Sequence, residues 1–194
     1  MAAKRQGVMG GTFDPIHHGH LVTAEEALWQ FELDEVVFVP TGLPWMKEHK
    51  DVAPSEDRYL MTVIATASNP SFSVSRLEID RDGPTHTVET LRRLRSEYPS
   101  DLKLYFITGA DAILELSEWK DSEEVQSLAQ FIAATRPGYD IGVFEGRPGV
   151  SVMDVPALAI SSTDIRRRVK QGRPIRYLVP GGVQTYIEKA SLYR

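Results

Sequence analysis

Apolar runs typical of β-strands alternate with helical patterns along this chain, and this alternation restricts its fold more than any other feature. Strands separated by helices form βαβ units with parallel strands and right-handed crossovers. The pattern predicts an α/β fold: a Rossmann-like three-layer sandwich with a mainly parallel sheet and helices on both faces. The predicted strands are Gly7–Gly10, Glu35–Pro40, Phe72–Ile79, Leu102–Ile107 and Phe131–Thr135; the predicted helices are His18–Phe31, Ser55–Ala67 with Ser55 as N-cap, Thr85–Glu97, Ser161–Lys170 and Pro180–Ala190.

Length and composition indicate an ordinary globular protein. A chain of 194 residues suits one domain, spanning residues 1–194, with a substantial core. No apolar run reaches the roughly 18 residues that span a bilayer, and the first residues do not resemble a secretory signal. The absence of cysteine excludes disulfides, thiolate metal sites and a cysteine nucleophile. We therefore expect a cytoplasmic protein without a membrane partner.

The distribution of charge points to a small anionic ligand. A net charge of −5 argues against nucleic acid as a partner, because polyanions require a broad basic surface. The segment Ser161–Arg176 nevertheless carries six basic residues and one acidic residue. A local basic cluster on an acidic protein suits a small anion, although a solvated helix face would have the same charges.

A glycine-rich segment directly follows the first predicted strand, where ligands bind in sheets of this kind. Gly10 and Gly11 allow phosphate oxygens to approach the backbone, and the N-terminus of the next helix attracts anions. His17 and His20 are three residues apart, share a face of that helix, and can each donate a hydrogen bond to phosphate. The pattern predicts a phosphate site that is neither a Walker A loop nor a GxGxxG loop.

Other interpretations of this segment remain open. Asp14 and Pro15 have the chemistry of an ordinary turn. The His-x-x-His pair would also suit zinc, but no third ligand is evident and we expect no protein-bound metal.

A second candidate phosphate site lies at Ile160–Arg166, near the other end of the chain. Ser161 and Asp164 have the spacing of a capping box, and capping alone would explain Ser161. Ser162 and Arg166 are four residues apart on one helix face, so both can reach one anion at the helix N-terminus. The arginine can bind phosphate oxygens as a fork.

Together the two loops resemble a known superfamily. His17–His20 resembles the HxGH signature of the nucleotidylyltransferases, and Ile160–Arg166 resembles their ISSTxIR signature. GGTFDPIHHGHL, RDGPTHTVETL, ITGADAILELSEW and TRPGY are similar to successive elements of bacterial nicotinate-nucleotide adenylyltransferases, and the resemblance covers essentially the whole chain. It implies that ATP and nicotinate mononucleotide give deamido-NAD and pyrophosphate.

The resemblance also implies a mechanism. The mononucleotide phosphate attacks the α-phosphorus of ATP in line, so neither a base nor a covalent intermediate is needed. Mg²⁺ would be bound through the ATP phosphates.

Site residues follow from the matching motifs. His17, His20 and Arg166 would be catalytic. ATP would be bound by Gly10, Gly11, Thr12, Phe13, Lys47, Gly109, Asp111, Ile160, Ser161, Ser162 and Thr163, with Asp111 on the ribose or, alternatively, only capping a helix. Nicotinate mononucleotide would be bound by Thr85, Thr87, Trp119 and Arg136. A helix N-terminus near Thr85–Thr87 would favour the nicotinate carboxylate, and Trp119 would stack on the pyridine, although a core tryptophan would look the same.

One loop departs from the family pattern. Pro44-Trp45-Met46-Lys47 stands where the family usually has Pro-Pro-His-Lys. Lys47 keeps the positive charge, whereas Trp45 leaves two roles open: a lid element, or a contact between copies of the chain in a homo-oligomer.

Three competing functions remain to be distinguished. Phosphopantetheine adenylyltransferases and cytidylyltransferases share both end motifs but not the middle elements. Class I tRNA synthetases carry a related motif on longer chains. A non-catalytic nucleotide sensor could use the same fold, but His17, His20, Lys47 and Arg166 are all present here.

Overall fold

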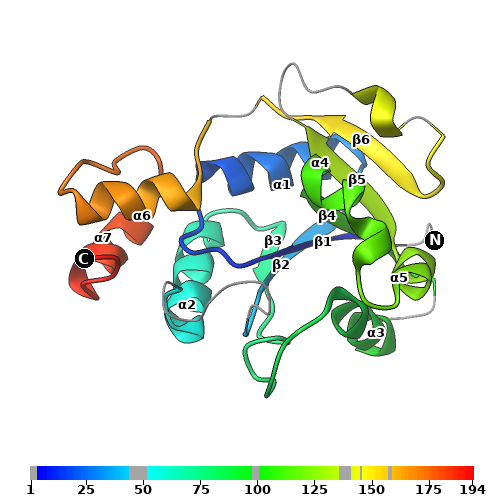
Figure 1. The fold of residues 1–194 in the computed structure, drawn as a ribbon, viewed down its shortest axis with the longest axis horizontal. Coiled ribbons are helices and arrows are strands. Elements are labelled where there is room, and N and C mark those ends of the chain that lie inside the picture. The colour runs from blue at the N-terminus through cyan, green and yellow to red at the C-terminus, as the bar shows by residue number, and fades with distance from the viewer. Residues whose placement is uncertain (1–3, 44–51, 98–100, 136–140, 145, 157–158) are drawn as a thin grey trace.

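A parallel β-sheet forms the centre of the protein. A computed structural model describes residues 4–43, 52–97, 101–135, 141–144, 146–156 and 159–194, which contain six strands in the order β3-β2-β1-β4-β5-β6, each parallel to its neighbours. The order reverses between β1 and β4 (Figure 1). The strands are β1 (Arg5–Gly11), β2 (Glu35–Pro40), β3 (Phe72–Val74), β4 (Lys103–Gly109), β5 (Gln130–Thr135) and β6 (Val150–Asp154).

Helices cover both faces of this sheet, which confirms the predicted three-layer α/β sandwich (Figure 1). One face packs against α1 (His18–Gln30) and α2 (Ser55–Thr66). The same core continues beyond the sheet to α6 (Ser162–Lys170) and α7 (Gly181–Lys189), and α7 packs against α2 (Figure 1). The other face packs against α3 (Thr87–Glu97), α4 (Ala110–Leu114) and α5 (Ser122–Leu128). Two short 3₁₀ helices, Leu116–Glu118 and Ile141–Phe144, complete the described elements.

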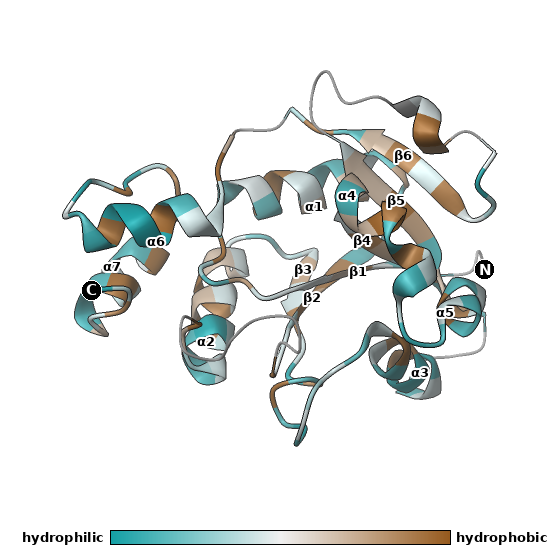
Figure 2. Ribbon diagram, viewed as in Figure 1, coloured by the Kyte–Doolittle hydropathy of each residue, from teal (hydrophilic) through white to brown (hydrophobic). Residues whose placement is uncertain are grey.

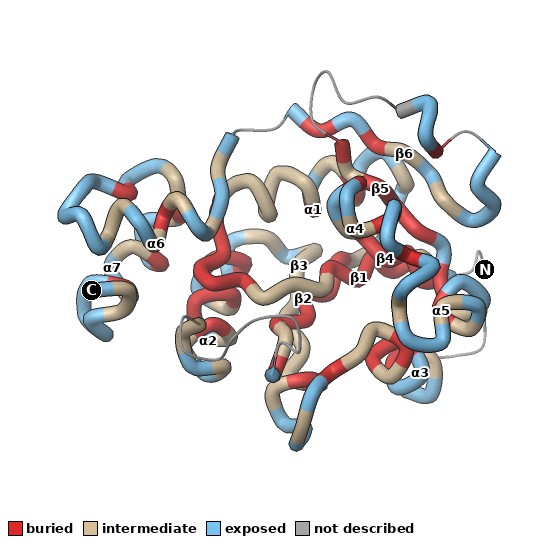
Figure 3. Tube along the Cα trace, in the orientation of Figure 1, coloured by how far each residue is buried: buried red, intermediate tan, exposed pale blue. Residues whose placement is uncertain are grey.

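Alternation along the strands produces two separate hydrophobic cores. In β1, Val8 belongs to the core beneath α3, and its neighbour Met9 to the core beneath α1. Phe106 and Ile107 of β4 divide in the same way because successive side chains point to opposite faces. Figures 2 and 3 show the central strands as largely apolar and buried, whereas α6 is mostly hydrophilic. Burial on both faces explains why these strands read as continuous apolar runs.

Several predicted boundaries were wrong. The strand predicted for Phe72–Ile79 ends at Val74, because β3 is an edge strand that pairs with β2 over three residues and the chain then turns. Ser55 is the first residue of α2 and Pro54 is its N-cap, with no side-chain cap hydrogen bond. The sequence analysis missed β6, α4 and α5, which are all seven residues or shorter. Short elements give a periodicity signal too few positions to repeat.

Candidate active site

Two cavities open where the strand order reverses, at the carboxyl ends of β1 and β4. The histidine cavity has a volume of about 390 Å³ and is lined by His17, His20, Gly109, Thr135, Ser161 and Ser162, among others. The tryptophan cavity has a volume of about 470 Å³ and is lined by residues that include Glu78, Thr85, Thr87, Asp111, Trp119 and Lys120. Gly10 and Thr108 line both. Two ligands bound in the two cavities would therefore meet at these strand ends.

The side chain missing from Gly10 leaves room at this meeting point. A Cβ atom on Gly10 would lie 3.1 Å from the Phe106 ring, which is tighter than ordinary van der Waals contact. The bare backbone therefore forms the wall that both cavities share.

The two motif histidines form a stacked pair at the start of α1. His17 is the N-cap residue, and its ring centroid lies 3.8 Å from that of His20. The backbone N–H of His17 donates to Nδ1 of His20 over 3.2 Å. Because this nitrogen accepts a hydrogen bond, a neutral His20 carries its proton on Nε2 and can donate from there.

The pKa of His20 lies well below its usual 6.5, because the ring is buried and His17 is adjacent. His20 is therefore a neutral hydrogen-bond donor at pH 7 in the free protein, rather than a cation. Its partner His17 is itself buried. The pair is suited to binding phosphate oxygens by directed hydrogen bonds.

We expect this histidine to make the stability of the free protein depend on pH. Below about pH 6.5 the unfolded chain binds a proton at His20 that the folded chain resists, so the free energy of unfolding should fall as the pH decreases. Urea unfolding at about pH 7.5 and about pH 5.5 measures this slope. His20→Asn should flatten it, whereas His18→Asn should keep it. An unchanged slope in His20→Asn would contradict the assignment.

The N-terminus of α6 is fastened to the loop between β1 and α1. Ser161 caps the helix by accepting a hydrogen bond from the Asp164 amide at 3.2 Å, as predicted. The Asp164 carboxylate pairs with Arg167 and Arg168, so it does not complete the capping box. The Ser162 hydroxyl donates to the carbonyl oxygen of Pro15 at 2.9 Å. The two sequence motifs are therefore in direct contact.

Asp14 has a larger role than the turn chemistry that its sequence indicated. Arg166 Nη1 donates to the Asp14 carbonyl oxygen at 2.7 Å and lies 3.5 Å from Oδ2 of its carboxylate. Oδ1 accepts from the Tyr193 hydroxyl at 2.7 Å and from the Ala53 amide at 3.2 Å. Burial and the nearby Asp14 raise the pKa of Tyr193, so this phenol stays protonated. Asp14 thus joins the first loop to α6 and to the end of the chain.

Arg58 is a buried cation that the sequence analysis missed. It is 1% exposed and donates to three backbone carbonyls: Thr12 at 2.8 Å, Gly42 at 2.8 Å and Ala53 at 3.0 Å. It therefore connects the loop after β1 with the loop after β2. A signal was present in the sequence, because Arg58 lies on the same helical face as the apolar Met61 and Ala65.

Glu78 is a buried carboxyl group in the wall of the tryptophan cavity, and it was also missed. The Thr90 hydroxyl donates to it at 2.5 Å, and burial raises its pKa. Its backbone carbonyl packs against Gly42, where an added Cβ would lie only 2.2 Å away. Glu78 and Arg58 therefore both contact the backbone at Gly42.

The predicted ATP-binding residues are divided among three cavities. Gly10, Gly109, Ile160, Ser161 and Ser162 line the histidine cavity with both histidines. Gly11, Thr12 and Asp111 line the tryptophan cavity. Thr163 and Arg166 line a third cavity of about 510 Å³, the basic cavity, together with Arg167, Lys170 and Arg194.

The remaining predicted residues have varied positions. Thr85, Thr87 and Trp119 line the tryptophan cavity as one group. Phe13 is 3% exposed and packs edge-on against His20, so it supports the histidine from the core. Lys47 and Arg136 lie outside the described residues, as do Pro44, Trp45 and Met46.

Two further observations concern the described residues alone. They hold no group of three or more His, Cys, Asp or Glu side chains arranged to bind a metal ion. Within the same ranges, none of the helices combines the length and apolar character that crossing a bilayer requires.

The fold and this paired-cavity site define a class of nucleotidyltransferases. Residues 8–168 match the model of the cytidylyltransferase-like family. A solved structure described as Plasmodium falciparum nicotinic acid mononucleotide adenylyltransferase complexed with NaAD has the same fold, with a TM-score of 0.83 at 22% identity. That match covers 98% of this chain and 97% of the other.

Close relatives specify the family. A Streptomyces coelicolor protein named "Probable nicotinate-nucleotide adenylyltransferase" is 64% identical over 96% of this chain and 99% of its own length. A Leifsonia xyli subsp. xyli protein of the same name is 61% identical over 98% of this chain and 94% of its own length. The chain belongs to the nicotinate-nucleotide adenylyltransferase family, which confirms the family inferred from the motifs.

Proposed function

We propose that this enzyme transfers the adenylyl group of ATP to nicotinate mononucleotide, giving deamido-NAD and pyrophosphate in NAD biosynthesis. One observation carries the proposal: two cavities of different chemistry share Gly10 and Thr108 at the switch point of the sheet. A reaction that joins two nucleotides requires such an arrangement. Each substrate has its own cavity, and the reacting phosphates can approach each other at the shared wall.

ATP is assigned to the histidine cavity. His17 and His20 at the start of α1, together with the Ser161 hydroxyl and the backbone N–H groups at the start of α6, supply hydrogen-bond donors next to two helix N-termini. Helix N-termini favour phosphate through their unpaired N–H groups and their partial positive charge. Thr163 and Arg166 in the basic cavity are assigned to the β- and γ-phosphates.

Nicotinate mononucleotide is assigned to the tryptophan cavity. The indole of Trp119 packs edge-on against Phe106 and Phe131, with centroid distances of 5.9 and 6.3 Å. These contacts fix a flat apolar surface on which a pyridine ring can stack. Thr85 and Thr87 bring the N-terminus of α3 to the same cavity.

The chemical step follows from this placement. A phosphate oxygen of the mononucleotide attacks the α-phosphorus of ATP, and the bond from that phosphorus to the bridging oxygen of pyrophosphate breaks. The bridging oxygen leaves with the electron pair. A phosphate anion is already a nucleophile at pH 7, so the protein need only align the reactants and stabilise the charge that builds up on the α-phosphoryl oxygens. His17 and His20 perform that stabilisation.

Mg²⁺ is proposed as part of the ATP substrate. ATP is bound by many enzymes as its magnesium complex, in which the ion keeps several water ligands. The ion would partly neutralise the triphosphate, while the protein supplies the donors of the histidine and basic cavities.

An acceptor panel tests this function. With MgATP, the enzyme should form a dinucleotide and pyrophosphate from nicotinate mononucleotide at least about tenfold more efficiently than from nicotinamide mononucleotide, a difference of ~1.4 kcal/mol. Chromatography of the products and a pyrophosphate assay measure both. Reactions without acceptor, or with excess EDTA, serve as controls and should release little pyrophosphate.

The other possible results of this acceptor panel lead to different conclusions. Pyrophosphate release only with phosphopantetheine would replace the acceptor and leave the adenylyl transfer intact. Nucleotide binding without turnover on any acceptor would favour a sensor and contradict the proposal.

A further inference from the structure

The carboxylate of Asp14 is buried beside the basic cavity, and its side chain is 1% exposed. Oδ1 accepts hydrogen bonds from the Tyr193 hydroxyl at 2.7 Å and from the Ala53 amide at 3.2 Å, and both of these residues line that cavity. Oδ2 accepts no hydrogen bond from any residue that the structure describes. A buried carboxylate with an unsatisfied oxygen strongly attracts a cation within its reach.

Arg166 is a cation within reach of this oxygen. Its Nη1 lies 3.5 Å from Oδ2 of Asp14, but it donates its hydrogen bond to the Asp14 carbonyl oxygen instead, at 2.7 Å. Arg166 makes no other hydrogen bond to the part of the chain that the structure describes. Because a guanidinium has five N–H donors, most of them remain for a ligand in the basic cavity, which Arg166 also lines.

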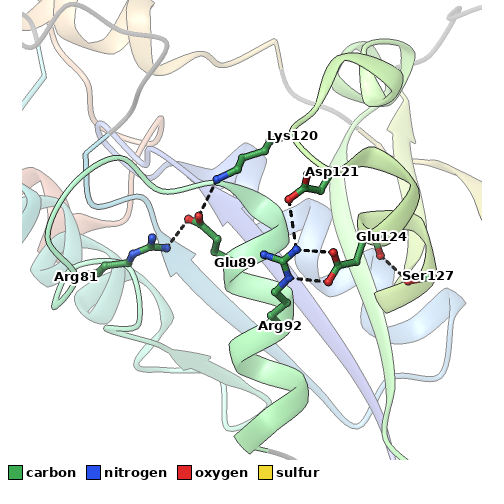
Figure 4. A network of polar contacts seen from close by, with 7 residues as sticks. All are labelled: Arg81, Glu89, Arg92, Lys120, Asp121, Glu124 and Ser127. Atoms are coloured by element: carbon green, nitrogen blue, oxygen red, sulfur yellow. Dashed lines mark hydrogen bonds and ion pairs between the residues drawn. The ribbon is translucent and has the colours of Figure 1, made fainter.

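An arginine elsewhere in this protein pairs much more completely with a carboxylate. Arg92 of α3 donates from Nε and Nη2 to the two oxygens of Glu124 (Figure 4). Such a fork requires that the carboxylate present both of its oxygens to the guanidinium. At Asp14, the hydrogen bonds from Tyr193 and Ala53 hold one oxygen and oppose the rotation that a fork with Arg166 would need.

Tyr193 has an unfavourable backbone conformation. Its φ is +63°, in the left-handed region that large side chains avoid. Such a conformation persists only where the surrounding contacts impose it, and it is common at functional sites. The hydrogen bond to Asp14 and the packing of the Tyr193 side chain against the core beneath α1 are two contacts of this kind.

We propose that Tyr193 is a positioning residue for adenylyl transfer, which acts on the triphosphate through Asp14 and Arg166. Its phenol hydroxyl holds the Asp14 carboxylate, so that the guanidinium of Arg166 stays directed to the basic cavity. This inference rests on the proposed function, in which Arg166 binds the β- and γ-phosphates of ATP. It adds a residue that touches neither the substrates nor the reacting atoms.

The test compares two tyrosines that make the same kind of hydrogen bond. Tyr186 of α7 donates to Oδ1 of Asp57 at 2.7 Å, as Tyr193 does to Oδ1 of Asp14, but Tyr186 and Asp57 are not among the described residues that line the three cavities. The kcat and the KM for ATP and for nicotinate mononucleotide are measured for the wild type, Tyr193→Phe and Tyr186→Phe. Urea unfolding verifies that each variant is folded.

Tyr193→Phe should lower kcat/KM for ATP about tenfold, because the Asp14 carboxylate can then turn and pair with Arg166. The KM for nicotinate mononucleotide should stay within about twofold of the wild type, since Arg166 is assigned to the triphosphate alone. Tyr186→Phe should keep both kinetic constants within about twofold and change only the stability.

A double-mutant cycle shows whether Tyr193 acts through Arg166. Tyr193→Phe is added to Arg166→Ala, and kcat/KM for ATP should then fall by no more than about a further twofold, because the residue through which Tyr193 acts is already gone. A purely structural role would lower kcat/KM by the same factor in both backgrounds.

Four results would overturn the inference. They are an unchanged kcat/KM for ATP in Tyr193→Phe, an equal loss in Tyr186→Phe, additive losses in the double-mutant cycle, and a Tyr193→Phe protein that does not fold while Tyr186→Phe does. Failure of the proposed function gives a different result, since the wild type would then form no dinucleotide from nicotinate mononucleotide.

Discussion

Replacing Arg166 with alanine is expected to lower kcat/KM by about 2–4 kcal/mol of transition-state stabilisation, a factor of roughly 30 to 1,000. Arg166 reaches the first loop from α6, where its Nη1 lies 2.7 Å from the Asp14 carbonyl oxygen, and it lines the basic cavity. A guanidinium has five N–H donors, so the group can hold Asp14 and still bind phosphate oxygens. Under the proposed function, its removal takes away a cation that would stabilise the leaving pyrophosphate.

Steady-state kinetics with varied ATP and varied acceptor would measure this loss. Arg168→Ala is a suitable control, because Arg168 lies two residues further along α6 and pairs with Asp164 at 2.6 Å. It should stay within about threefold of the wild type, because a partly exposed ion pair contributes little. Near-normal turnover of folded Arg166→Ala would remove Arg166 from the mechanism.

Replacing Arg58 with methionine is expected to lower the free energy of unfolding by about 3–5 kcal/mol. The methionine fills much of the space but leaves the buried carbonyl of Gly42 and the part-buried carbonyls of Thr12 and Ala53 without their donor. A buried polar group that loses its partner costs about 1–3 kcal/mol, and the two part-buried carbonyls add to that loss. Activity should fall too, because Thr12 and Gly42 belong to loops that border the site.

Urea unfolding measures this effect, and Arg95→Met is the matched control. Arg95 also donates to backbone carbonyls, those of Leu102 and Leu128, but it is only half-buried and belongs to α3. Water can replace its hydrogen bonds more easily, so its loss should cost no more than about 1–2 kcal/mol. An equal loss in the free energy of unfolding for Arg58→Met and Arg95→Met would contradict the prediction that the hydrogen bonds of Arg58 contribute more to stability.

The longer helices and the strands buried on both faces of the sheet were predictable because the sequence pattern that marks each of them is local. The apolar runs of β1, β2, β4 and β5 and the longer helices were found from residues within a few positions of one another. β3 and β6 lie at the two edges of the sheet, and each has only one neighbouring strand. Edge strands are less buried, so the pattern misjudged the length of one and missed the other.

The site was predictable only in part, for a related reason. Glycines after a strand and hydroxyl residues at a helix start are marked by their immediate neighbours in the chain, so the sequence could point to Gly10, Ser161 and Ser162, which line the histidine cavity. Buried polar side chains act through distant partners. The Tyr193–Asp14 hydrogen bond joins residues 179 positions apart, and the Arg58–Thr12 hydrogen bond joins residues 46 positions apart. No local pattern specifies such pairs.

By itself, the sequence determined the layers of the fold, the two phosphate motifs and the family, because each is written in short runs of neighbouring residues. Only the tertiary structure decided how the site is divided. It brought the ends of β1 and β4 together so that two cavities share Gly10 and Thr108, and it gave Lys120 to one and the histidine pair to the other. That division depends on which strands lie side by side, and strand order is set by long-range packing.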